Sequence, residues 1–157
     1  MTRIELTTHI RAPRERCFDL SRSVELHARS TAATGETAVG GRTRGLLGPG
    51  DDVTWRARHF GVWQTLTSRI TAYERPVFFA DTMVASAFAH LHHEHHFDDD
   101  GRGGTVMRDV FEFAAPYGAL GRLAERLVLA RYLRRFLLAR NREIKAVAES
   151  TAWREFV

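Results

Sequence analysis

Apolar and polar residues alternate along most of the chain up to residue 113, and helical spacing replaces this alternation after residue 118. Alternation is typical of strands, because successive side chains point to opposite faces. It predicts strands at 2–11, 42–47, 53–59, 62–73, 77–84, 88–97 and 105–113. Two short helices are expected at 13–21 and 23–29, followed by an irregular segment at 30–41.

The last part of the chain predicts one long helix over residues 118–149. This segment contains no proline, and its apolar residues recur at spacings of three and four: Leu120, Leu123, Leu127, Leu133, Leu137, Ile144 and Val147. The order of elements indicates an α+β fold, in which a curved antiparallel sheet of about six to seven strands wraps around a long C-terminal helix. We expect a single domain at 1–149 and a C-terminal tail at 150–157.

Five of the eight histidines lie between residues 90 and 96, inside a predicted strand. Strand parity divides them between two faces. One face carries Leu91, His93, His95 and Phe97, and we expect it to point inward because apolar residues bound it. The other face carries only polar residues and should meet water: His90, His92, Glu94 and His96.

The neighbouring strands have apolar inner faces that are interrupted by one or two titratable groups. Together with the histidine strand, they place five such groups inside: His59, Asp81, His93, His95 and Asp109. A buried carboxylate is costly unless it is paired, and a histidine N–H is a natural partner. If consecutive strands are neighbours, Asp81 and Asp109 flank the strand that carries His93 and His95.

The composition excludes some classes of function. The 23 basic and 19 acidic residues leave a net charge of +4, which is modest, and no nucleic-acid-binding motif is present. Arginines between residues 122 and 142 form a predicted solvated helix face that allows transient contact with an anionic membrane. The N-terminus lacks the apolar segment of a signal peptide, so a cytoplasmic location is expected. Cys17 is the only cysteine, which excludes an internal disulfide.

Several segments resemble the START-like helix-grip superfamily, also called the polyketide cyclase/dehydrase and lipid-transport (SRPBCC) superfamily. They are similar to a bacterial subgroup of ligand-binding-like proteins: Gly-Asp-Asp-Val-Thr-Trp-Arg-Ala-Arg-His-Phe-Gly at 50–61, Arg75-Pro76-x-x-Phe79-x-Asp81-x-Met83, His93-Glu94-His95 and Met107-x-Asp109-Val110-Phe111. The resemblance implies a deep cavity between sheet and helix that holds an apolar small molecule. It does not imply one chemistry, because some members carry lipids, some bind hormones and some cyclise polyketides.

The leading hypothesis is binding, including carriage, of a lipid-like or aromatic molecule. The five titratable residues would orient its polar end, and Trp55, Phe79, Met83 and Met107 would form the apolar wall. One alternative is a cyclase or aromatase in which His93 or His95 acts as acid or base on an enolisable substrate. Another is a structural or interaction protein whose interior is filled by its own side chains. Metal binding by His93, His95 and a carboxylate rests on spacing alone, and we expect no cofactor.

Overall fold

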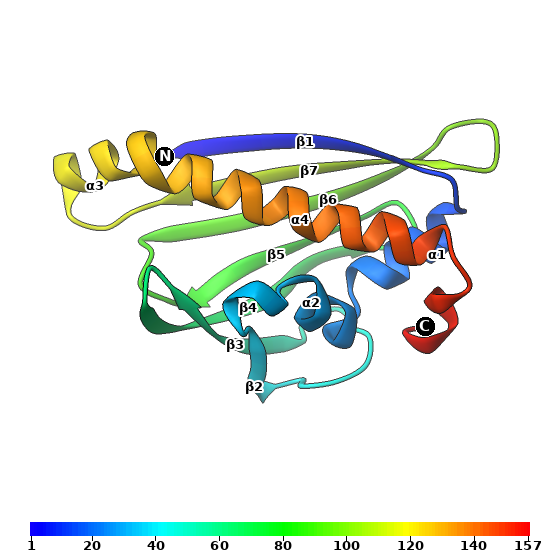
Figure 1. Cartoon of the computed structure of the whole chain (residues 1–157), viewed down its shortest axis with the longest axis horizontal. Coiled ribbons are helices and arrows are strands. Elements are labelled where there is room, and N and C mark those ends of the chain that lie inside the picture. Colours follow the sequence, from blue (N-terminus) through cyan, green and yellow to red (C-terminus); the bar gives the residue numbers. More distant parts are fainter.

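One seven-stranded antiparallel sheet forms the framework in the computed structural model, which describes all residues from Met1 to Val157. Its strand order is β1-β7-β6-β5-β4-β3-β2 (Figure 1). The strands are β1 (Thr2–Ile10), β2 (Thr37–Gly41), β3 (Asp52–His59), β4 (Val62–Glu74), β5 (Phe78–Ala85), β6 (His90–Asp99) and β7 (Thr105–Ala114). Consecutive strands from β2 to β7 are therefore neighbours, and β1 closes the sheet against β7.

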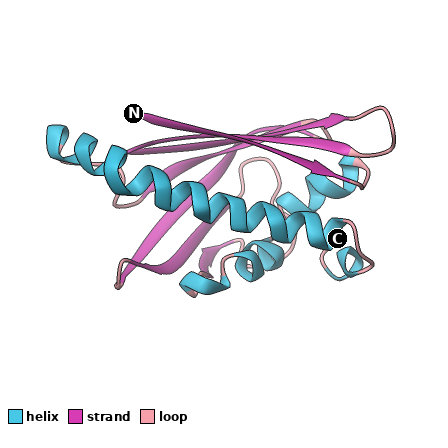
Figure 2. Cartoon of the chain, turned by 45° about the horizontal axis from the view of Figure 1, so that its top comes forward, coloured by secondary structure: helices cyan, strands magenta, loops and turns pink.

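All the helices lie on the same side of the sheet, with the long C-terminal helix running across it (Figure 2). The two short helices α1 (Arg14–Ser21) and α2 (Val24–Ser30) follow β1, as the sequence predicts. The long helix is continuous but has three parts: α3 (Gly118–Ala124), a π-helical turn (Glu125–Leu129) and α4 (Ala130–Ala148). The predicted helix-grip architecture is confirmed.

The main core lies between α1, the sheet and the C-terminal half of α4. Phe18 is fully buried and packs edge-to-face on three aromatic rings, with centroid distances of 5.4 Å to Tyr73, 5.3 Å to Phe79 and 5.3 Å to Phe97. Cys17 is also buried in this cluster, and no other cysteine is present. Residues from strands far apart in the sequence therefore meet on α1, which holds the curved sheet together at this end.

The edge of the sheet differs from the sequence prediction. The strand expected at 42–47 is a loop, and the edge strand is β2, inside the segment expected to be irregular. β2 buries little and ends in two glycines, so it lacks the apolar alternation that predicts strands. Gly41 has a φ of +67°, and a Cβ there would lie 2.3 Å from the Asp52 carbonyl oxygen, so glycine is required where β2 meets β3.

The first three leucines of the long helix also differ from expectation. Leu120, Leu123 and Leu127 are exposed, and the buried residues at this end of the helix are instead Gly121 and Glu125. The physical reason is visible in Figure 1, where α3 extends beyond the end of the sheet. The apolar spacing is helical in both halves, but only the half that contains Leu133, Leu137, Ile144 and Val147 has a sheet to pack against.

The C-terminal tail turns back along the molecule. It forms a short 3₁₀ helix, Ala152–Glu155, and Trp153 and Phe156 pack against the main core. The Arg16 guanidinium lies 4.2 Å from the centre of the Trp153 ring. These two aromatic residues are therefore half-buried by their own chain.

Replacing Phe18 with alanine should lower the free energy of unfolding by about 3–5 kcal/mol, because it removes a ring that three other rings surround. Urea unfolding monitored by tryptophan fluorescence measures this loss. The control is Val84→Thr, at a half-exposed position on the sheet, which should change stability by no more than about 0.5 kcal/mol. Equal losses in the two variants would contradict the central position of Phe18.

Candidate functional site

Three neighbouring strands bring two carboxylates and two histidines together on the inner face of the sheet. In the pairing of β5, β6 and β7, Asp81 stands opposite His93 and His95 stands opposite Asp109. The side chains bond along the diagonals: His93 Nε2 lies 2.8 Å from Asp109 Oδ1, and His95 Nε2 lies 2.8 Å from Asp81 Oδ2. Both imidazoles are buried and adjacent, with ring centroids 3.7 Å apart.

The long helix completes this cluster with two residues that the sequence analysis does not select. Asn141 Nδ2 donates to Asp109 Oδ2 at 2.6 Å, and Arg140 Nη1 lies 3.5 Å from Asp109 Oδ1. Arg140 also places Nη2 3.4 Å from His95 Nδ1 and donates to Asn141 Oδ1 at 2.9 Å. Helical spacing from Leu133 and Leu137 was the signal that could have placed both residues inside.

The partners of each group determine its charge. Burial opposes the ionisation of Asp109, but the hydrogen bonds from His93 and His95 and the charge of Arg140 hold its pKa well below the usual value. The pKa of Asp81 is lowered despite burial, chiefly by the hydrogen bond from His95. Burial, followed by repulsion from His95, lowers the pKa of His93 to about 4, so this imidazole is neutral at neutral pH.

These charges fix the tautomer of His93. Since Asp109 is ionised, it accepts, and His93 Nε2 must carry the proton that it donates. The second ring nitrogen, Nδ1, is then an acceptor. It makes no hydrogen bond within the protein, whereas every fully buried side-chain nitrogen and oxygen has a partner. His93 Nδ1 is therefore not sealed in the protein but opens into the neighbouring cavity. Asp81 Oδ1 also lacks a protein partner.

A cavity of about 150 Å³ lies between the sheet and the long helix, and the cluster forms part of its wall. His93, His95, Asp81 and Arg140 supply the polar side of this wall. Trp55, Phe79, Leu91, Phe111 and Leu137 are among its apolar lining residues. The ring of Phe79 stacks on His95 at a centroid distance of 4.1 Å, so an apolar and a polar group share one surface. The interior is therefore not filled entirely by its own side chains.

His59 lines the same cavity but does not join the cluster. It is hydrogen-bonded through Nδ1 to the hydroxyl of Tyr132 on α4, and burial lowers its pKa. It also lines a second cavity of about 260 Å³, which lies beside Phe60, Tyr117 and Leu129. His59 thus stands between two compartments, while the other four predicted titratable residues meet at one point.

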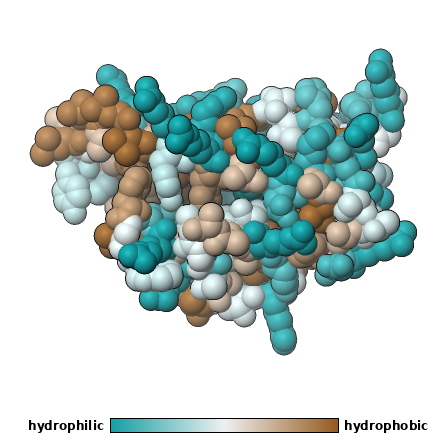
Figure 3. Space-filling model, in the orientation of Figure 1, coloured by the Kyte–Doolittle hydropathy of each residue, from teal (hydrophilic) through white to brown (hydrophobic).

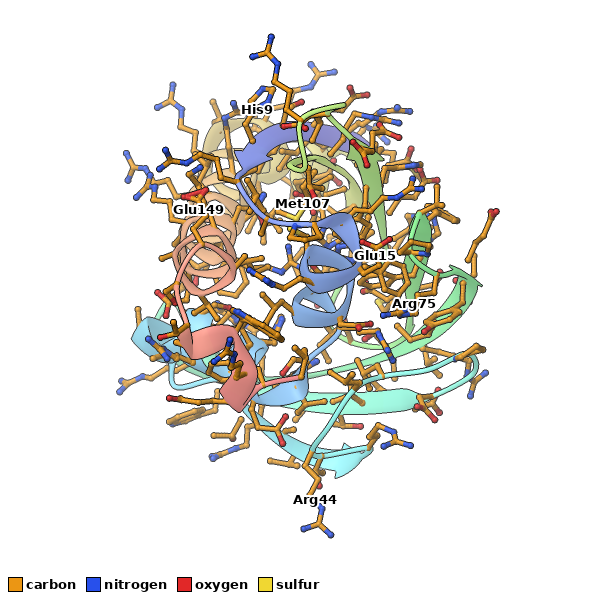
Figure 4. The ribbon with its side chains drawn as sticks, turned by 90° about the vertical axis from the view of Figure 1, so that its right-hand side faces the viewer. His9, Glu15, Arg44, Arg75, Met107 and Glu149 are labelled. Atoms are coloured by element: carbon orange, nitrogen blue, oxygen red, sulfur yellow. The ribbon has the colours of Figure 1, made fainter.

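Two of the predicted wall residues lie elsewhere. Met107 is fully buried in the main core, where the Ser21 hydroxyl lies 3.7 Å from its sulfur, and Figure 4 shows it in the interior behind α1. Met83 is half-buried and packs on a separate apolar cluster with Leu91 and Phe113. Neither side chain lines the cavity, because the inner face of a curved sheet packs partly on the helices and only partly around the open space.

The histidines on the outer face of β6 form hydrogen bonds with polar side chains of that face. His96 Nε2 lies 2.9 Å from Glu94 Oε2, and His92 Nδ1 lies 2.8 Å from the Thr82 hydroxyl. All of His90, His92, Glu94 and His96 are partly exposed, as parity predicts. They do not reach the cavity.

Asp81, His93 and His95 are also the residues that could hold a metal ion. One ligand atom from each lies within 4.8 Å of the others. The donor set fits a divalent cation only in part, since His95 Nε2 is already hydrogen-bonded to Asp81 and Arg140 places a positive charge beside His95. A cation would have to displace the proton that joins His95 to Asp81, so the arrangement favours a hydrogen-bonded network.

Comparisons with known proteins agree with this architecture. The model of the polyketide cyclase/dehydrase and lipid transport family matches residues 1–149. The chain belongs to this family. No curated protein matches the chain. Solved structures do match the chain. One of them, an aromatase/cyclase from a Streptomyces species, has a TM-score of 0.75 at 18% identity, over 94% of this chain and 93% of the other.

Two further structures show how widely the polyketide cyclase/dehydrase and lipid transport fold is shared. The protein TTHA0849 from Thermus thermophilus has a TM-score of 0.72 at 15% identity, over 94% of this chain and 99% of the other. A START superfamily protein from Mycobacterium smegmatis has a TM-score of 0.69 at 10% identity, over 94% of this chain and 97% of the other. At these identities the likeness shows the fold alone. None of the helices of this family member has the length and apolar character needed to cross a membrane.

The depressed pKa of His93 should make the protein less stable in mild acid. Unfolded histidine titrates near 6.5, and folded His93 near 4, so the unfolded state binds more protons between these values. The free energy of unfolding is therefore not reduced by His93 above the unfolded pKa, and it falls as the pH drops through this window. From about pH 7 to about pH 5, the expected loss is about 2 kcal/mol, measured by urea unfolding.

His93→Gln is the matched control for this pH dependence. Glutamine can still donate to Asp109 but does not titrate, so the loss of stability in acid should be much smaller. A residual dependence is expected from His59, whose pKa burial also lowers. An unchanged pH dependence in His93→Gln would show that other groups destabilise the fold in acid.

Proposed function

We propose that the protein binds an apolar small molecule, aromatic or lipid-like, whose polar end is a hydroxyl group. The observation that carries this proposal is the pair of unsatisfied acceptors, His93 Nδ1 and Asp81 Oδ1, at the edge of a cavity with apolar walls. Pockets for small molecules generally combine an apolar lining with a few polar groups that fix orientation. A cytoplasmic location, expected from the sequence, is part of the proposal.

The chemistry of the acceptors selects the polar end of the ligand. Both open atoms accept hydrogen bonds and neither can donate, so the ligand must bring the proton. Asp81 supplies one of the two open atoms, and its lowered pKa keeps this carboxyl group negatively charged. A ligand carboxylate would face this negative charge directly inside a poorly hydrated site, whereas a phenol, an enol or an alcohol would donate a hydrogen bond to it.

The volume of the cavity limits the size of the ligand. About 150 Å³ is less than the several hundred cubic ångströms of a typical drug-sized site. The second cavity shares His59, Gln64, Ala87, Phe88 and Leu133 with the first, so a longer molecule could extend into it. The polar cluster would then hold the head of the ligand, and the second cavity its apolar tail.

A matched pair of probes tests the proposal: 2-naphthol and 2-naphthoate, which differ at the polar group. We expect 2-naphthol to bind more tightly, measured by isothermal titration calorimetry. Asp81→Asn replaces an open acceptor by a donor while leaving an oxygen for His95. It should weaken 2-naphthol binding roughly tenfold, as expected for a lost hydrogen bond to a charged group, and improve the binding of 2-naphthoate.

The control for this substitution is Glu94→Gln, on the outer face of β6. It removes one carboxylate charge from the strand next to β5, which carries Asp81, without reaching the cavity. Its affinities should equal those of the wild type. Tighter binding of 2-naphthoate than of 2-naphthol by the wild type would contradict the proposed ligand class. Native mass spectrometry of the purified protein would identify a ligand that co-purifies, and its mass should fit a hydroxyl-bearing apolar molecule.

A second candidate is a cyclase or aromatase activity. It is favoured by the His93–Asp109 pair, in which the carboxylate orients the ring and leaves Nδ1 open to the cavity as a base. It is also favoured by the similarity to the Streptomyces aromatase/cyclase. Against it stands the strength of the base, because a pKa of about 4 lies some three units below neutrality. That deficit costs about 4 kcal/mol in proton affinity compared with an ideal base.

If the protein does catalyse cyclisation, His93→Gln should abolish turnover of an enolisable polyketide-like substrate while binding remains measurable. His95→Gln is the comparison, since His95 has no free ring nitrogen and should affect turnover less. Product formation by liquid chromatography and mass spectrometry is the readout. Turnover that survives in His93→Gln would exclude His93 as the base.

A further inference from the structure

The start of the long helix carries an exposed apolar surface that the proposed cavity does not explain. Leu120 is 77% exposed, Leu127 is 62% exposed, and Leu123 and Val128 are at least half exposed. With Tyr117 they form one surface, which we call the leucine face. Figure 3 shows this hydrophobic surface at the upper left, over the end of the molecule where α3 lies in Figure 1.

The leucine face is built into the fold and does not arise from a loose helix end. A Cβ at Gly121 would lie 1.9 Å from the Pro116 carbonyl oxygen, so the backbones touch there. Glu125 is buried, accepts from the Ala115 N–H and accepts from the Thr2 hydroxyl at 2.9 Å. These two residues fix the overhanging helix to β7 and β1, and the leucines are left pointing into solvent.

The exposed charges on the stretch of helix that carries the leucine face have one sign. Between residues 113 and 142, Glu125 is the only carboxylate, and it is buried. Arg122 and Arg126 lie among the leucines and are exposed, and Arg131, Arg134 and Arg135 follow along the solvent side of α4. An apolar helix surface with arginines among and beside its leucines, and with no exposed acid on the same stretch of helix, is complementary to a surface that is apolar beneath and anionic at its edge.

The leucine face also borders the entrance to the interior. Tyr117 lines the second cavity, together with Leu129 and Tyr132 from the helix and Phe60 from the turn between β3 and β4. Phe60 is itself 59% exposed. Apolar side chains therefore flank this cavity on both sides, and the cavity lies next to the compartment that holds His93, since the two share lining residues.

We propose that the leucine face docks on an anionic lipid bilayer and brings the cavity mouth to the membrane. This inference rests on the proposed function, since it supplies the route by which an apolar ligand enters or leaves. A bilayer fits better than a second copy of the chain. Two copies that met through this face would bring arginine against arginine, whereas anionic headgroups neutralise the same charges.

Sedimentation with lipid vesicles tests the docking. The protein should bind vesicles of phosphatidylcholine mixed with phosphatidylglycerol, and bind vesicles of phosphatidylcholine alone much more weakly. The double variant Leu123→Gln/Leu127→Gln should lose roughly tenfold or more of the affinity. Arg122→Gln/Arg126→Gln should lose roughly fivefold per arginine, and high salt should remove this difference.

The matched control is Val39→Gln/Val84→Gln, which removes two exposed apolar side chains from β2 and β5 instead. It should bind vesicles like the wild type. The proposal is wrong if the wild type ignores the anionic vesicles, or if the leucine variant binds them as well as the control does. It is also wrong if the wild type is a dimer that the leucine variant dissociates, because a second copy then covers the face.

Binding of 2-naphthol separates this result from a failure of the proposed function. The leucine variant should retain wild-type affinity for 2-naphthol in the absence of vesicles, because none of its substituted residues lines either cavity. Vesicle binding without 2-naphthol binding would reject the proposed ligand and leave the docking surface standing. The reverse result would reject the docking surface alone.

Discussion

The structure depends on keeping one carboxylate ionised in its interior. Asp109 is fully buried, and a charge in that position is tolerated only when its partners replace water. Those partners come from different elements: His93 from β6, and Arg140 and Asn141 from α4. Asp109 therefore fixes the long helix in register over the sheet, and the same bonds fix the ring of His93 in the tautomer that leaves Nδ1 open. The ionised Asp109 therefore both holds α4 on the sheet and leaves an open hydrogen-bond acceptor in the site.

Strand parity explains why much of the site could be predicted. Asp81, His93, His95 and Asp109 each interrupt an otherwise apolar face, and antiparallel neighbours bring such faces together. Arg140 and Asn141 were not selected, because arginines are frequent along this helix and most are solvated. Their spacing from Leu137 and Ile144 is the only feature that distinguishes them, and it indicates burial but not the partner. The bonds themselves depend on register, which alternation along one strand does not contain.

The predictions that failed share a physical reason. Leu120 and Leu127 have the spacing of a packed helix face, but spacing does not reveal where the sheet ends. Met107 has the correct parity to face inward, but an inward side chain meets either a helix or the cavity, depending on the curvature of the sheet. β2 pairs through its backbone and buries little, so its sequence lacks the apolar alternation of a strand. In each case the missing information is the arrangement of other elements in space.

The two ends of the interior have opposite character, and this difference would give the proposed ligand a direction. The acceptors of His93 and Asp81 lie at the middle of the sheet, under α4, where no donor of the protein satisfies them. The other end, beside Phe60 and Tyr117, is lined mainly by apolar groups and lies next to the leucine face. A molecule that arrives from a membrane with its apolar part leading would meet the polar cluster with the wrong end. For the proposed ligand and the proposed docking on a bilayer, the arrangement instead favours entry with the hydroxyl group first, so that the apolar part would stay at the mouth and be the last to leave the lipid.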